Sequence, residues 1–132
     1  MLAQLVPLDN IDLHWDKVAP ILSHDRALNN WVTIDSLYNR LKANGADLWI
    51  LEDYTAALIG ATYMRTDGTK TYVVEIMAAQ NAKEDWSYTI QSIESQAKEW
   101  GCTSIQVRGR KGWKRVLPEY ATIQITLERQ LC

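Results

Sequence analysis

Cysteine is scarce in this sequence. Its two cysteines, Cys102 and Cys132, are too few for a disulfide framework, and one of them is the C-terminal residue. Residues 1–7 lack the basic start and long apolar core of a secretory signal, and no apolar run approaches the length of a membrane span. We therefore expect a protein that stays in a reducing compartment and has no membrane segment.

Proline, glycine and serine do not gather into a linker, and no low-complexity tract or internal repeat divides the chain. The 132 residues are 47% hydrophobic and 23% charged, which fits one domain with one core. We expect residues 1–132 to form that single domain. The formal net charge of -2 argues against a general nucleic-acid binder, although a local basic patch could still act.

Motifs of several common enzyme classes are also missing. No P-loop, Ser/His/Asp arrangement or metal-binding motif is visible. His14 and His24 lack nearby carboxylates or cysteines at the spacing of a metal site, so we expect both at the surface or in helix packing. Cys102 follows a helix-ending glycine and precedes an apolar strand, which predicts a small buried residue.

Local signals predict two helices near the N-terminus. A short strand over residues 2–6 precedes a helix over residues 11–26, in which Pro20 is expected to cause a kink or a break. Thr33 can cap a second helix, which Asn44 ends because asparagine accepts the left-handed backbone conformation.

The rest of the chain changes its hydrophobic period. Strands over residues 48–52, 57–64 and 71–78, joined by tight connections, form an antiparallel meander. From residue 84 the period becomes about 3.6, which predicts a helix that Gly101 ends before a strand at 104–107. That unit should be a right-handed parallel crossover. A short helix and a last strand over residues 121–127 complete an α/β fold, a mixed sheet flanked by helices.

A cluster of cations stands out in this slightly acidic chain, around two glycines and a tryptophan. Three interpretations are open: a solvated helix face, binding of nucleotide or nucleic-acid phosphates, and docking on an acidic protein surface. Trp31 lies outside any clear apolar stripe and is a candidate anchor for a partner. The cations of the cluster are Arg108, Arg110, Lys111, Lys114 and Arg115.

The order of these elements resembles that of the GNAT superfamily of N-acetyltransferases over nearly the whole chain. Short motifs are similar to those of small GNAT-like proteins of tailed bacteriophages. This resemblance implies a protein of the virion or of the host cytoplasm that binds a virion or host protein. The motifs are Trp15-x-x-Val18-x-Pro20-x-Leu22, Leu48-Trp49, Gly101-Cys102 and Val107-x-Gly109-Arg110-x-Gly112-Trp113-x-Arg115.

What the superfamily resemblance implies for a cofactor depends on one loop. Members bind acetyl-CoA where the fourth and fifth strands separate, and a glycine-rich loop turns backbone N–H groups toward the pyrophosphate. In this chain the loop has no glycine, and Glu84 and Asp85 follow it with charges that would repel a phosphate. We expect no cofactor, with acetyl-CoA as the alternative. The loop residues are Gln80, Asn81, Ala82 and Lys83.

The resemblance also implies an acid and a base. Glu75 lies in the strand that often carries the base, and burial among apolar neighbours would raise its pKa toward a useful value. The alternation of faces favours a carboxylate on the solvent side instead. The customary tyrosine acid falls on Arg115, which cannot donate a proton at neutral pH. We expect Tyr120 to be a core aromatic residue.

Together these observations predict a bacteriophage GNAT-fold protein without efficient acetyltransferase chemistry, which acts by binding a virion or host protein. One alternative is an active acyl-CoA-dependent N-acyltransferase that uses Glu75 as its base. The other is binding of anions or nucleic acid through residues 108–115, with nucleic acid less favoured because of the net charge.

Overall fold

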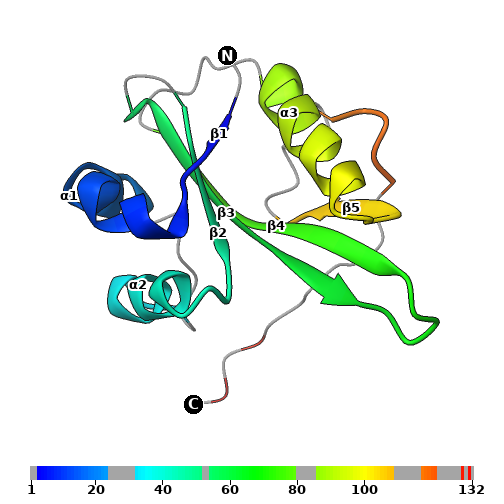
Figure 1. Cartoon of the computed structure of the whole chain (residues 1–132), viewed down its shortest axis with the longest axis horizontal. Coiled ribbons are helices and arrows are strands. Elements are labelled where there is room, and N and C mark those ends of the chain that lie inside the picture. Colours follow the sequence, from blue (N-terminus) through cyan, green and yellow to red (C-terminus); the bar gives the residue numbers. More distant parts are fainter. Residues whose placement is uncertain are drawn as a thin grey trace.

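A computed structural model describes residues 3–23, 32–51, 54–79, 86–108, 117–121, 129 and 131, without the side chains of residues 86 and 87. Figure 1 shows the arrangement of its helices and strands. A 3₁₀ turn at Leu8–Asn10 leads into the first α-helix. The elements, in chain order, are β1 (Gln4–Leu5), α1 (Ile11–Leu22), α2 (Ile34–Lys42), β2 (Asp47–Ile50), β3 (Ala56–Met64), β4 (Lys70–Ala79), α3 (Trp86–Glu99) and β5 (Ser104–Val107).

The five strands form one sheet in the order β1-β2-β3-β4-β5. β1 to β4 pair with their neighbours in antiparallel fashion, whereas β4 and β5 are parallel. The predicted meander and parallel crossover are therefore confirmed, and β5 has the predicted bounds. The short helix after β5 and the last strand fall outside the described residues.

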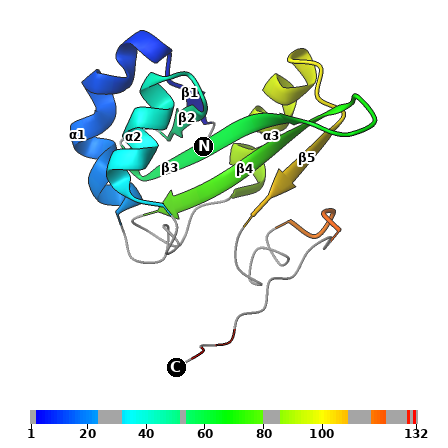
Figure 2. The same ribbon diagram turned by 90° about the horizontal axis from the view of Figure 1, so that it is seen from below.

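Helices cover both faces of the sheet. Figures 1 and 2 show α1 and α2 on one side and α3 on the other. One core cluster joins α1 and α2 to β2, β3 and β4 through residues such as Leu48 and Ile76. The second joins α3 to the opposite face through Tyr72 and Val74. A side chain in the middle of this sheet therefore has no solvent side to point to.

The predicted helix ends at Thr33, Asn44 and Gly101 are confirmed. Thr33 accepts a hydrogen bond from the Ser36 N–H, and the Ser36 side chain accepts one from the Thr33 N–H, which completes a capping box. Asn44 and Gly101 take positive φ angles of 60° and 85°. The Gly101 N–H donates to the Lys98 carbonyl and the Cys102 N–H to the Ala97 carbonyl, so two carbonyls in the last turn of α3 are satisfied.

The first helix differs from its prediction in length. α1 ends at Leu22 rather than near Arg26, and it continues through Pro20 without a break. Pro20 has no N–H to donate to the preceding turn. Ser23 is the C-cap of the helix, and its N–H and its hydroxyl both donate to the Ala19 carbonyl.

The middle of β4 contains a β-bulge. Gly60 pairs with Val74 and Ile59 pairs with Ile76, so Glu75 has no opposing residue in β3. Tyr72 and Val74 face α3, whereas Ile76 faces α1 and α2. The extra residue thus reverses the alternation, and it places Glu75 at the point where the strand changes its buried face.

Candidate functional site

The C-terminal half of β4 has a free edge, which we call the β4 edge and define as residues 75–79. β4 continues to Ala79, but β5 pairs only with residues 71–74. The last link is a hydrogen bond of 2.9 Å from the Arg108 N–H to the Val74 carbonyl. Among the described residues no strand pairs with the β4 edge on its β5 side. Within those described ranges, its backbone groups on that side have no strand to bond with.

Glu75 begins the β4 edge and is held by side chains from two other elements. The Arg40 guanidinium, on α2, donates through Nη1 to Oε2 at 2.5 Å and through Nη2 to Oε1 at 3.3 Å. The Tyr63 hydroxyl, on β3, donates to Oε1. The Glu75 side chain is only 10% exposed, so the predicted position on a solvent face is wrong. Helix α2 covers the face to which Glu75 points.

The partners of Glu75 decide its protonation. Burial by itself would raise the pKa of Glu75, but the hydrogen bonds from Arg40 and Tyr63 outweigh it and hold the pKa below the ordinary value. Glu75 is therefore a carboxylate at neutral pH. The expectation that burial would raise this pKa to the value of an effective base is wrong, because Arg40 and Tyr63, which are distant in sequence, donate hydrogen bonds to the carboxylate.

We call Glu75, Arg40 and Tyr63 the Glu75 cluster, and Arg40 also joins this cluster to the loop after α2. Its Nε donates to the Gly45 carbonyl at 3.2 Å, and its Nη2 donates to the Tyr63 hydroxyl at 3.1 Å. Sequence reasoning missed both Arg40 and Tyr63. A basic residue in the last turn of a helix is common for electrostatic reasons alone, so Arg40 carried no signal of its own.

Several solved structures share the fold of this chain over nearly its full length. A probable acetyltransferase aligns with a TM-score of 0.69 at 11% identity, covering 100% of this chain and 97% of the other. A ribosomal-protein-alanine N-acetyltransferase from Brucella melitensis biovar Abortus aligns with a TM-score of 0.66 at 13% identity, covering 98% of both chains. A predicted acetyltransferase from Clostridium acetobutylicum, solved with acetyl-CoA, aligns with a TM-score of 0.63 at 15% identity, covering 98% of this chain and 94% of the other.

The chain has the GNAT fold. The predicted fold class is therefore confirmed, a mixed sheet of an antiparallel meander and a parallel crossover flanked by helices. No protein-family model and no curated protein matches the sequence. The likeness of this domain to known proteins is thus one of fold.

The basic cluster at residues 108–115 is described only at its first member. Arg108 is 59% exposed, and its Nη1 lies 3.8 Å from Glu75 Oε1. Arg108 thus adds a second guanidinium, after that of Arg40, beside the Glu75 carboxylate. These three charged side chains together carry a net positive charge. The predicted partner residue Trp31 lies outside the described residues, as does His24. So do the other predicted binding residues, Gln80, Asn81, Ala82, Lys83, Arg110, Lys111, Lys114 and Arg115.

Other predicted residues take structural positions in the fold. Tyr120 packs against the α3-side core, and burial raises its pKa, so its hydroxyl stays protonated at neutral pH. Cys102 is buried, as predicted. His14 lies in α1, and its Nδ1 lies 2.7 Å from the Tyr54 hydroxyl oxygen.

The described residues offer neither a metal site nor a membrane span. Within them, no group of three His, Cys, Asp or Glu side chains is arranged to hold a metal ion. No helix in the same ranges is both long and apolar enough to cross a membrane.

Proposed function

We propose that this GNAT domain binds an acyl-CoA along the β4 edge and transfers the acyl group to an amine. The observation that carries the proposal is the end of the β4–β5 pairing at Val74, while β4 itself continues to Ala79. The shared fold with acetyltransferases, one of them solved with acetyl-CoA, supports it.

The β4 edge suits a ligand that contains amide groups. Residues 75–79 keep a strand conformation, and an extended ligand can hydrogen-bond with such an edge as an added strand would. The pantetheine arm of an acyl-CoA contains amides, and the bound molecule supplies an acyl thioester that an amine can attack. The bulge aims the Glu75 side chain toward α2, away from α3, so the carboxylate borders the start of this edge on one face.

Glu75 is the proposed general base, but only after a change in its contacts. An alkylammonium has a pKa of about 10. A carboxylate whose pKa is lowered by Arg40 is a weak acceptor for that proton. Catalytic hydrogen bonds often form only when substrates are present. In this proposal the bound substrates draw Arg40 away from Glu75, and burial then raises the pKa of the carboxyl group.

The second candidate is a GNAT-fold protein that binds a virion or host protein of a bacteriophage without efficient acyl transfer. The same Glu75 contacts favour it, since a carboxylate that accepts hydrogen bonds from Arg40 and Tyr63 links three elements of the fold and is suited to a structural role. The absence of glycine from residues 80–83 and the presence of Arg115 where a tyrosine acid is customary also support it.

Two measurements separate these candidates. Isothermal titration of the wild-type protein with acetyl-CoA should give a dissociation constant in roughly the micromolar range. Thiol release from acetyl-CoA in the presence of primary amines should then fall by about 100-fold or more in Glu75→Gln, with binding unchanged. Glu99→Gln, at the exposed end of α3, is the matched control and should keep the wild-type rate.

The outcomes have distinct meanings. Binding without thiol release would favour the second candidate over transfer. If neither acetyl-CoA nor free CoA gave a heat of binding, the proposed acyl-CoA site would be wrong. Equal rates in Glu75→Gln and wild type would remove Glu75 from the role of base.

A further inference from the structure

A pocket of about 280 Å³ lies at the other edge of β3, away from β4. β2 begins at Asp47, opposite Gly60, so among the described residues no strand pairs with residues 61–64 on that side. The hairpin of β3 and β4 extends past β2 at this point (Figures 1 and 2). The pocket is lined by residues 44–47, Ala61, Thr62 and Trp100.

Asp47 brings a negative charge to this pocket. Its Oδ2 accepts a hydrogen bond of 2.8 Å from the Tyr72 hydroxyl. That hydroxyl in turn accepts one of 2.9 Å from Trp49 Nε1. None of the ion pairs among the described residues includes Asp47. The hydrogen bond that its carboxylate accepts therefore comes from a neutral group.

The surroundings of Asp47 make this charge costly. Asp47 is half-buried, and burial raises the pKa of its carboxyl group despite the hydrogen bond from Tyr72 and the positive charge of Arg40, which forms its ion pair with Glu75. A partly desolvated carboxylate is stabilised most by a cation that can donate hydrogen bonds to it. The pocket beside it has the space for such a group.

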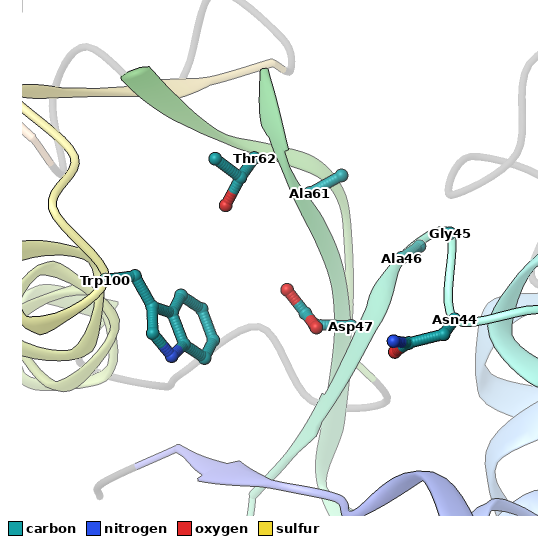
Figure 3. Close-up of a pocket in the computed structure, with 7 residues that line it drawn as sticks. All are labelled: Asn44, Gly45, Ala46, Asp47, Ala61, Thr62 and Trp100. Carbon is teal, nitrogen blue, oxygen red and sulfur yellow. The ribbon is translucent and has the colours of Figure 1, made fainter. Parts of the chain in front are cut away.

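Trp100 forms the wall that faces Asp47. Figure 3 shows the indole ring on one side of the pocket and the carboxylate pointing toward it from the other. The indole packs against the rings of Trp49 and Tyr72, with distances between ring centroids of 6.3 Å and 5.6 Å, and these contacts hold it in place. An indole face attracts cations through its ring electrons. The Thr62 hydroxyl lies at the rim of the same pocket.

We propose that this pocket is a binding site for a primary ammonium group, held between the Asp47 carboxylate and the Trp100 indole. A single carboxylate with an aromatic wall suits an organic cation better than a metal ion, which needs several oxygen ligands. The site is separated from the β4 edge by β3 and by the buried Tyr72. It is therefore additional to the proposed acyl-CoA site and does not depend on it.

The test uses the full-length protein with n-butylammonium, without any CoA, and follows binding by NMR of the tryptophan indole N–H signals. We expect saturable binding in roughly the millimolar range, as for one small group. Asp47→Asn should weaken it about ten-fold or more, because it removes the charge while keeping an acceptor for Tyr72. Asp35→Asn, at an exposed position in α2, is the matched control and should bind as wild type does.

A neutral probe and a lysine model complete the experiment. n-Butanol has a similar size without the charge and should not bind. Tighter binding of an N-acetyl-lysine amide than of n-butylammonium would identify a lysine side chain as the natural group, whereas weaker binding would identify a free amine. The proposal fails if none of the amines binds, if n-butanol binds as well as n-butylammonium, or if Asp47→Asn binds within about two-fold of wild type.

Discussion

Replacing Gly60 by alanine is expected to lower the free energy of unfolding by about 3 kcal/mol, as overpacking of a rigid core does. A Cβ atom at this position would lie 2.4 Å from the Tyr72 hydroxyl oxygen and 2.6 Å from a ring carbon. Tyr72 is fully buried and cannot swing away, because its hydroxyl is bonded to both Trp49 and Asp47. Urea denaturation at neutral pH measures the effect.

The control for Gly60 is a glycine that is constrained by conformation alone. Gly68, in the β3–β4 turn, has a φ of +88°, and a Cβ atom added there would meet no other atom within 4 Å. Its replacement by alanine should cost only about 1 kcal/mol. Tyr72→Phe should lower the unfolding free energy less in the Gly60→Ala protein than in the wild type. In the Gly60→Ala protein the change also removes the hydroxyl oxygen that clashes with the added Cβ atom. A Gly60→Ala protein as stable as the Gly68→Ala protein would contradict the tight contact.

Replacing Arg40 by methionine is expected to lower the free energy of unfolding by about 2 kcal/mol at neutral pH. The change leaves the Glu75 carboxylate, 10% exposed, without its bidentate partner, and breaking a buried pair usually costs more than this. Arg40 is itself one-third exposed, so solvent weakens the pair, and the expected loss is smaller than for a fully buried one.

The same variant should respond differently to pH. In the wild type the pKa of Glu75 is lowered by folding, so its contribution to stability is present above the ordinary carboxyl range and is lost as pH falls through the folded pKa. In Arg40→Met, burial without the ion pair should raise that pKa. The stability difference between the two proteins should therefore shrink between about pH 7 and about pH 4.

An exposed ion pair provides the control for Arg40. Lys42 lies 2.7 Å from Asp12 on the surface, and Lys42→Met should change the unfolding free energy little. In a double-mutant cycle, Glu75→Gln should recover part of the loss caused by Arg40→Met. Equal stabilities of Arg40→Met and Lys42→Met would show that the Glu75 cluster is not the stabilising contact that its geometry indicates.

Much of the fold could be predicted because its signals are local. Thr33 is followed three residues later by Ser36, and Gly101 follows an apolar stripe of helical period. Each of these signals reports only on its own turn of the chain. Strands with alternating or continuous apolar residues between turn residues were found for the same reason, with errors of one or two residues at their ends.

The candidate sites could not be predicted because they depend on register and packing between distant residues. Glu75 meets Arg40 across 35 positions, and the bulge beside it follows from the pairing of β3 with β4. Asp47 and Trp100 face the same pocket only because β2 and the end of α3 meet at one sheet edge. The residue types at these positions do not by themselves distinguish them from ordinary surface or core positions.

The most direct test of the account is the location of acetyl-CoA on the protein. In backbone amide NMR spectra, adding acetyl-CoA should shift the signals of residues 75–79 and Arg108, which border the point where β4 and β5 separate. Residues 61–64, on the far edge of β3, should not shift. Unchanged spectra at millimolar acetyl-CoA, or shifts confined to that far edge, would contradict an acyl-CoA site on the β4 edge.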